Sequence, residues 1–253
     1  MNNNEMKNLK ETLVAGIKDW FERTNGKVAV IGISGGKDST CVAALCVEAL
    51  GVENVIGVSM PNGVQSDMDD VNRVFNLLKI KRVDINIHDA FESILKQMND
   101  IKDNTIINLP PRLRMSALFA VAQSCDKEAR VMNTCNLSED MVGYATIFGD
   151  ACGLYAPLSK VTCTEVKELA HYMGVNKELA FKTPSDGLCG QTDEDKLGFT
   201  YESLDNFIRK NEGSDEFKEM IMKKYKANKF KLDLIQIPHP EVKLPNYITK
   251  ENV

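Results

Sequence analysis

The chain has 253 residues, of which 43% are hydrophobic and 26% charged, a composition that suits one sizeable globular core and excludes a fibrous, disordered or disulfide-dependent miniature protein. Lys and Arg total 31 against 36 for Asp and Glu, and the net charge of −5 argues against a nucleic-acid surface spread over the whole molecule. No apolar run approaches the roughly 18 residues that cross a bilayer, and residues 1–7 lack an apolar signal segment, so we expect an unexported, cytoplasmic protein without membrane contact.

The first part of the chain alternates predicted helices with predicted strands. Apolar residues recur at helical spacing over 6–21, which predicts an amphipathic helix that packs on the domain or on a partner subunit. The continuous apolar run 28–33 predicts a strand covered on both faces, and the almost wholly apolar stretch 39–50 predicts a buried helix that ends at a glycine. Residues 55–60 repeat the strand pattern, and another amphipathic helix is expected from Ser66.

The same alternation continues further along the chain. A strand is expected over 82–87, and Pro110 and Pro111 introduce the next helix, because proline is tolerated in a first helical turn. Another strand fits 129–134. A capping-box pattern that starts at Thr162 predicts a further helix.

These elements predict an α/β fold with a doubly wound, mostly parallel five-stranded sheet and helices on both faces. We expect a single domain over 1–253. An N-terminal helix (1–25) and a lysine-rich C-terminal part (211–253), with a helix over 216–228 and an irregular tail, flank the α/β core (26–210). Ligands of such sheets bind beyond the carboxyl ends of the strands, so the functional motifs are expected to gather there.

The hexapeptide SGGKDS at 34–39 stands directly after the first predicted strand and directly before the first buried helix. Two glycines let the backbone turn tightly and bring its N–H groups to a ligand, and the helix N-terminus adds partial positive charge. This combination predicts an anion cradle that takes phosphate. The Walker A and GxGxxG loops do not fit, because Lys37 is followed by Asp38 and Gly32 lies one residue too close.

SGGKDS resembles the PP-loop of the ATP pyrophosphatase superfamily, whose members cleave ATP between the α- and β-phosphates to adenylate a carbonyl or carboxylate. Further motifs follow in an order that resembles ammonia-dependent NAD synthetases over approximately residues 28–210. The resemblance implies an adenine nucleotide alpha-hydrolase-like, Rossmann-like fold and a homodimer. The motifs are MPNGVQSDMDD at 60–70, NLPPRLRM at 108–115, NTCNLSE at 133–139, GYATIFGD at 143–150 and TPSDG at 183–187.

The resemblance also implies roles for residues in these motifs, which outside them would be ordinary surface, turn or cap residues. Asp38 and Glu139 are implied to be the catalytic carboxylates that ligate Mg²⁺, an ion that prefers one or two carboxylates together with phosphate oxygens. The implied ATP contacts are Gly32, Ile33, Ser34, Gly35, Gly36, Lys37, Asp38, Ser39, Met60, Thr134 and Ser185. The implied contacts of the dinucleotide substrate are Arg112, Arg114, Asp150 and Lys229.

Three residues depart from the family's pattern. In the family, a lysine at the position of Ile147 and an aspartate at the position of Leu154 touch the deamidated dinucleotide. Cys163 stands where the family has a lysine that binds ATP. Lys160, three residues earlier, is the candidate to reach the ATP phosphates instead. Losing a charged hydrogen bond costs about 1.5–3 kcal/mol of binding, so the substrate is either held differently or is a different molecule.

The resemblance predicts a carbon–nitrogen ligase of NAD biosynthesis, which adenylates deamido-NAD with ATP and Mg²⁺, releases pyrophosphate and lets ammonia displace AMP. No side-chain nucleophile is required, because positioning and neutralisation of phosphate charge do most of the work. Residues 186–198 are expected to close over the adenylate, with an ordinary flexible loop as the alternative. We expect no glutaminase domain, so the nitrogen source is free ammonia or ammonia from a separate glutaminase subunit.

Two other functions stay open. One is another PP-loop enzyme, which modifies tRNA or a nucleobase or acts on a different acid, and Ile147 and Leu154 motivate it. Thiolation of tRNA usually uses a catalytic cysteine pair and a basic surface, whereas the seven cysteines include no CxxC. The other is a nucleotide-binding regulator that has lost catalysis, which Cys163 motivates.

Overall fold

Parallel strands form the centre of the structure, a computed structural model that describes residues 1–65, 67–182 and 192–233. Within these residues the sheet has the strand order β3-β2-β1-β4. Val30 of β1 is in register with Ile56 of β2 and with Val131 of β4. The four strands are β1 (Val28–Gly32), β2 (Val55–Ser59), β3 (Lys81–Asp84) and β4 (Ala129–Val131).

The fold class is confirmed, although the described sheet has four strands rather than the predicted five. Where a fifth strand would lie, Met132 and Tyr155 form an isolated parallel bridge beside β4. The Asn133 N–H donates to the Tyr155 carbonyl at 2.8 Å, and the Leu154 N–H donates at 2.8 Å to the carbonyl of Val131, the last residue of β4. Pro157 follows, and because proline has no N–H to donate, the ladder does not continue.

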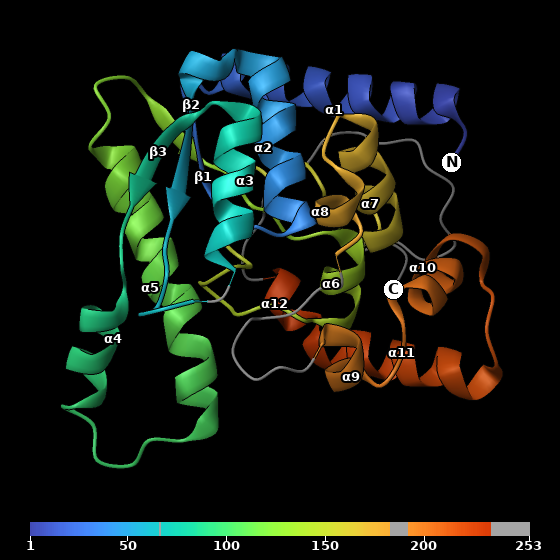
Figure 1. Cartoon of the computed structure of the whole chain (residues 1–253). Helices are drawn as coiled ribbons and strands as arrows, with labels where there is room; N and C mark the ends of the chain where they lie inside the picture. The colour runs from blue at the N-terminus through green and yellow to red at the C-terminus, as the bar shows by residue number, and fades with distance from the viewer. Residues whose placement is uncertain (66, 183–191, 234–253) are drawn as a thin grey trace.

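Helices cover both faces of the sheet, as a doubly wound fold requires (Figure 1). On one face lie α2 (Lys37–Leu50) and α3 (Met68–Leu78), and α1 (Asn3–Arg23) and α7 (Cys163–Tyr172) pack against α2. The short η1 (Val52–Asn54) joins α2 to β2. α1 buries its predicted apolar stripe in the main core of the domain, through Met6, Leu9, Leu13, Ile17 and Trp20.

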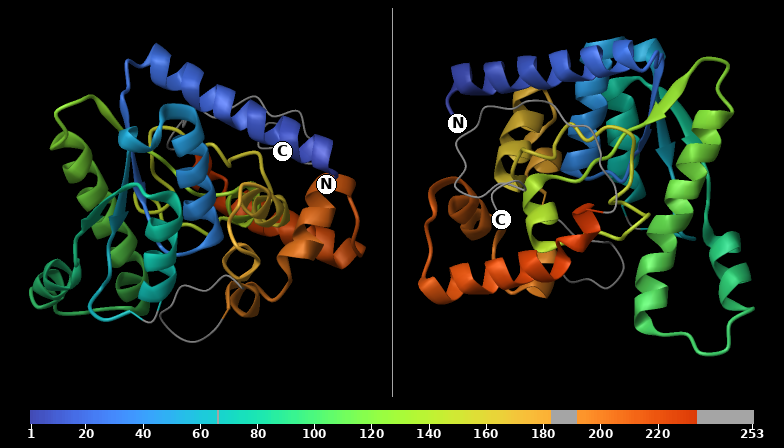
Figure 2. Two further views of the ribbon diagram at one scale, coloured as in Figure 1. Left: turned by 45° about the horizontal axis from the view of Figure 1, so that its top comes forward. Right: turned by 180° about the vertical axis from the view of Figure 1, so that it is seen from behind.

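The opposite face is covered by α5 (Asp103–Gln123), which carries α4 (His88–Leu95) on its side (Figure 2). The prediction that Pro110 and Pro111 begin this helix is wrong, because the helix starts at Asp103 and both prolines lie inside it. An interior proline costs a helix about 3 kcal/mol, and burial of Met115 and Leu118 against the sheet offsets this cost. Neither α5 nor any other helix of the described part is long and apolar enough to span a membrane.

The C-terminal helices form a further layer with its own apolar core, to which α6, α10 and α11 contribute. The helix predicted over 216–228 is confirmed as α11, whereas residues 234–253 of the predicted tail lie outside the described residues. The short helix α9 occupies part of the predicted closing loop, of which residues 186–191 are also outside the description. The bounds are α6 (Leu137–Val142), α8 (Lys177–Ala180), α9 (Asp193–Leu197), α10 (Tyr201–Lys210), α11 (Asp215–Asn228) and α12 (Phe230–Asp233).

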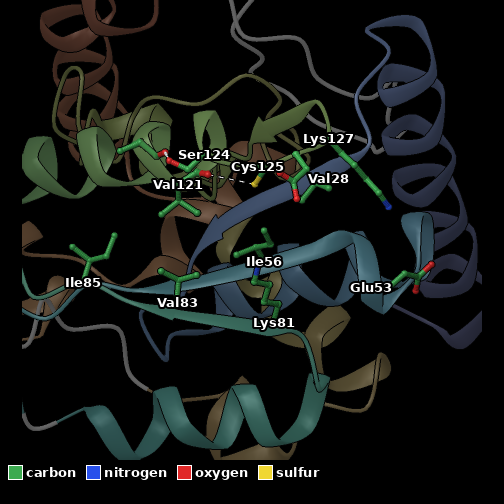
Figure 3. Close-up of a pocket in the computed structure, with 12 residues that line it drawn as sticks. Val28, Glu53, Ile56, Lys81, Val83, Ile85, Val121, Ser124, Cys125 and Lys127 are labelled. Carbon is green, nitrogen blue, oxygen red and sulfur yellow. Dashed lines mark hydrogen bonds between the residues drawn. The ribbon is translucent and has the colours of Figure 1, made fainter.

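A hollow of about 500 Å³ lies between α5 and the sheet, and it extends along the whole of β3 (Figure 3). It is lined by Val28 and Lys81, which begin β1 and β3, and by Val121 and Cys125 near the end of α5. Ligands of doubly wound sheets bind at the carboxyl ends of the strands. None of the predicted site residues lines this hollow, so it is not the predicted site.

Candidate active site

The loop between β1 and α2 forms a cradle at the carboxyl edge of the sheet. Gly35 has a φ of +78°, a left-handed conformation that glycine adopts without steric cost. A Cβ at this position would stand 3.0 Å from both Asp70 Cβ and the backbone nitrogen of Val71, in the first turn of α3. The hydroxyl oxygens of Ser34 and Ser39 lie 3.1 Å apart across the loop. These hydroxyls and the N–H groups that begin α2 are the donors with which a helix N-terminus binds phosphate.

Asp38 and Glu139 meet at this loop from the first turns of two helices, α2 and α6. Asn136, the N-cap of α6, connects them: its Nδ2 donates to Asp38 Oδ1 at 2.9 Å and its backbone N–H donates to Glu139 Oε2 at 3.2 Å. Lys37 Nζ donates to the second carboxylate oxygen, Asp38 Oδ2, at 2.7 Å. The sequence analysis did not single out Asn136, although the N-x-x-E capping-box spacing at 136–139 was a readable signal.

The surroundings of Glu139 disfavour its charge. The pKa of Glu139 is raised well above its ordinary value, first by burial and then by the charge of Asp38, and Lys37 offsets only part of this. Burial by itself lowers the pKa of Lys37, but the negative groups around it outweigh burial, so the net shift is upward and the amine stays protonated. Tyr201 packs here too, with its ring centroid 5.9 Å from Lys37 Nζ. Its buried hydroxyl has no hydrogen-bond partner among the described residues.

This set of donors fits a magnesium ion. Mg²⁺ is usually bound through one or two carboxylates together with substrate phosphates and waters, rather than by an all-protein cage. Asp38 and Glu139 supply two carboxylates beside the phosphate cradle, and the partnerless hydroxyl of Tyr201 could hydrogen-bond to a water of the ion's shell. Over the residues that the structure describes, no group of three or more His, Cys, Asp or Glu is arranged to hold a metal.

The two predicted substrate arginines both connect α5 to neighbouring segments. Arg114 Nε donates to the Met60 carbonyl, directly after β2, at 2.9 Å. Burial lowers the pKa of Arg114, an effect that the charge of Asp150 opposes. The exposed Arg112 donates through Nε to the Ile147 carbonyl at 3.0 Å. The structure thus brings Met60, both arginines and the 143–150 motif to one place beside the cradle.

The 143–150 motif is held against α5 by polar contacts and by close packing. Asp150 Oδ1 accepts from the Thr146 N–H at 3.0 Å, and Thr146 Oγ1 donates to Asn108 Oδ1 at 2.9 Å. A Cβ on Gly149 would stand 2.8 Å from Pro111 Cβ, so only glycine permits this approach. The motifs at 108–115 and 143–150 therefore form one continuous surface. Asp150 has a structural contact in addition to its predicted contact with substrate.

A lysine that the sequence analysis missed also reaches this motif. Lys231 Nζ, from α12, donates to the carbonyls of Gly143 at 2.8 Å and Ala145 at 3.3 Å. Burial lowers the pKa of Lys231, against the opposing charge of Asp150. Lys229, the predicted substrate lysine, lies two residues earlier at the end of α11. The lysine-rich composition drew attention to this stretch, but only the structure shows which lysine touches the 143–150 motif.

The three departures from the family's pattern have different surroundings. Leu154 is 37% exposed, Ile147 is half-buried, and Cys163 is fully buried at the start of α7. Lys160 is half-buried and contributes its backbone carbonyl, at 2.9 Å, to Arg209. Of the other predicted ATP contacts, Thr134 is half-buried between β4 and α6, and Ser185 lies outside the described residues.

Comparison with known proteins identifies relatives over nearly the whole chain. The family model described as NAD synthase matches residues 9–237. The NH3-dependent NAD+ synthetase of Mycoplasmopsis pulmonis is 35% identical over 238 residues, which is 92% of this chain and 91% of that protein. The solved structure of the NMN synthetase from Francisella tularensis is 33% identical and superposes with a TM-score of 0.83, covering 92% of this chain and 98% of that one. The NH3-dependent NAD synthetase from Campylobacter jejuni is 25% identical with a TM-score of 0.77, over 94% and 99% of the two chains.

Proposed function

The chain belongs to the NAD synthase family, and we propose that it adenylates the nicotinate carboxylate of deamido-NAD with ATP and then amidates it with ammonia. It is thus a ligase that forms a carbon–nitrogen bond, as its NH3-dependent relatives are. The observation that carries this proposal is the convergence of Asp38 and Glu139 beside the glycine loop after β1. Two carboxylates next to an anion cradle suit a triphosphate that arrives with a divalent cation.

In the first step, an oxygen of the substrate carboxylate attacks the α-phosphorus of ATP, and the bond from that phosphorus to the α–β bridging oxygen breaks. Pyrophosphate leaves with the bonding electrons. The N–H groups and hydroxyls of the loop, together with the N-terminus of α2, hold the negative charge that grows on this leaving group. Asp38 and Glu139 would hold Mg²⁺, whose positive charge stabilises the phosphate oxygens when it is bound.

In the second step, ammonia attacks the carbonyl carbon of the adenylate, AMP leaves, and the nitrogen gives up a proton to solvent. Adenylation comes first because a carboxylate is an inert acyl donor. Arg112 and Arg114 would orient the dinucleotide, since both lie where α5, the end of β2 and the 143–150 motif meet. No protein nucleophile takes part, because the attacking groups belong to the two substrates.

A specific observation favours a second candidate, the amidation of nicotinate mononucleotide. The structure from Francisella tularensis that superposes on this chain is that of an NMN synthetase. In addition, Ile147 and Leu154 stand where the resemblance implies a lysine and an aspartate that touch the dinucleotide. An acid that lacks the adenylyl half of deamido-NAD would need fewer such contacts.

One experiment separates these candidates. The purified full chain receives ATP, Mg²⁺ and ammonium together with either deamido-NAD or nicotinate mononucleotide, and kcat/KM is measured for each acid. Equal amounts of AMP and NAD, with a higher kcat/KM for deamido-NAD, support the first candidate. A higher kcat/KM for the mononucleotide supports the second. If neither acid leads to AMP and pyrophosphate, both proposals are wrong.

We also propose that two copies associate, which is the assembly implied by the family resemblance, in the cytoplasm. Five large apolar side chains between residues 94 and 107 are 37–52% exposed, on and between α4 and α5. A second copy is a suitable cover for such a patch. Sedimentation of the wild-type chain and of an Ile107→Asp variant tests this, because the variant should shift the equilibrium toward monomer. The five exposed apolar side chains of this patch are Ile94, Met98, Ile101, Ile106 and Ile107.

A further inference from the structure

Lys37 belongs to the phosphate loop by sequence, but its side chain points into the protein. It is the first residue of α2, at the mouth of the cradle, and yet it is only 3% exposed. Its ammonium lies in a pocket formed with Asp38 and the ring of Tyr201. A lysine that touched phosphate directly would need its amine on the open side of the loop.

The contacts of Lys37 hold its ammonium directly against Asp38, one of the two proposed metal ligands. Nζ lies 2.7 Å from Asp38 Oδ2, while Asn136 Nδ2 donates to Asp38 Oδ1 at 2.9 Å. Both oxygens of the carboxylate are therefore engaged, although each keeps a second lone pair that a metal could use. Glu139, the other carboxylate of the pair, also acts electrostatically on this ammonium.

We propose that Lys37 is a positioning residue that acts as the built-in counter-ion of the Asp38–Glu139 pair, so that magnesium binds the protein weakly alone and enters together with ATP. This inference rests on the proposed nucleotide site. The ammonium competes with a divalent cation for Asp38 and repels it through a poorly screened interior. The same positive charge, buried at the N-terminus of α2, attracts the triphosphate.

The two effects have opposite signs, which separates them from a loss of structure. Removing the charge should strengthen the binding of metal in the absence of nucleotide and weaken the binding of ATP in the absence of metal. A merely structural role for Lys37 predicts that both affinities fall together. An arginine at this position keeps the charge and should keep both affinities close to the wild-type values.

The test uses the full chain and two binding measurements that need no turnover. Mn²⁺ is titrated without nucleotide and followed by electron paramagnetic resonance, and ATP is titrated in a chelator by calorimetry. For Lys37→Met we expect Mn²⁺ to bind at least about tenfold more tightly and ATP at least about tenfold more weakly. Lys37→Arg should stay within about threefold of wild type for both ligands. The control is Lys10→Met, which removes a lysine of α1 whose Nζ lies 2.6 Å from Glu48, near the end of α2 that is far from the loop.

Several outcomes would overturn the inference. It is wrong if Lys37→Met binds Mn²⁺ as weakly as wild type, if both affinities fall, or if Lys10→Met reproduces the change. If Lys37→Met does not fold, Lys37→Gln, which removes the charge but keeps a hydrogen-bond donor, is measured in the same way and judged by the same criteria. If the wild-type chain forms the amide but Lys37→Met shows no gain in Mn²⁺ affinity, the inference about Lys37 is wrong and the proposed function stands. A wild-type chain that binds neither Mn²⁺ nor ATP contradicts the proposed function as well.

Discussion

Replacing Asp38 by asparagine tests the buried ion pair and the proposed site together. Asparagine keeps the shape of the side chain, and its Oδ1 can still accept from Asn136. In place of the carboxylate oxygen that lies 2.7 Å from the Lys37 ammonium, however, it presents an amide N–H group, so two donors face each other. Lys37 is only 3% exposed, so water cannot replace the lost partner. Breaking a buried pair from one side costs about 3–5 kcal/mol. Because Glu139 still attracts the ammonium, we expect the lower end, about 3 kcal/mol of unfolding free energy.

A double-mutant cycle measures this value. Urea unfolding is recorded for wild type, Asp38→Asn, Lys37→Met and the double variant, which removes both charges of the Lys37–Asp38 pair. We therefore expect the double variant to be more stable than Asp38→Asn, with a coupling energy of about 1–3 kcal/mol. Pyrophosphate release by Asp38→Asn should fall at least about 100-fold, which corresponds to about 2.7 kcal/mol of transition-state stabilisation. Additive destabilisation refutes the buried pair, and unchanged turnover refutes the assignment of Asp38 to the site.

Three further predictions concern the loop, a second ion pair and the thiols. Gly35→Ala should weaken ATP binding and lower stability by about 1–3 kcal/mol, because it forces a Cβ into a left-handed position 3.0 Å from Asp70 Cβ. Calorimetry and urea unfolding measure the two effects against wild type, and unchanged values would contradict the left-handed turn. Arg209→Met should lower stability by about 2 kcal/mol, because it removes two N–H donors, at 2.7 and 2.5 Å, from the partly buried Glu165 carboxylate, which still accepts from the Thr162 N–H. A loss below about 1 kcal/mol in urea unfolding would contradict this. A thiol reagent with peptide mapping should label the half-exposed Cys125 and Cys152 in the native state. It should reach Cys41, Cys46 and Cys163 only after unfolding, because these thiols are fully buried and burial raises their pKa. Labelling of these three cysteines in the native state would contradict their burial.

Much of the core could be predicted from local pattern. The apolar runs at 28–33 and 55–60 became the two central strands, and the apolar stripe of residues 6–21 became the buried face of α1. These patterns depend on which residues a strand or helix must bury, so the repeat along the chain is enough to find them. The start of α5 was predicted wrongly, because local propensity opposes a proline inside a helix. The apolar contacts of α5 with the sheet outweigh that cost.

The candidate site could be predicted in part. The order of the motifs indicated Asp38 and Glu139, and the structure places both at the loop after β1. It did not indicate Asn136, which joins the two carboxylates, or Lys231, which reaches the 143–150 motif from α12. The capping-box spacing at 136–139 marks Asn136 as a helix cap. The contacts of both residues with segments far away in sequence leave no local signal.

The sequence by itself determined the α/β plan, the glycine turn between the first strand and helix, and the family, because each depends on neighbours within a few residues or on motifs in a set order. Only the tertiary structure decided that the ammonium of Lys37 turns inward to Asp38, and that Asn136 completes the pair from 98 positions away. The physical reason is that local steric and hydrogen-bond preferences act over one turn of chain. Which charge meets which across the site is settled by how whole helices and strands pack.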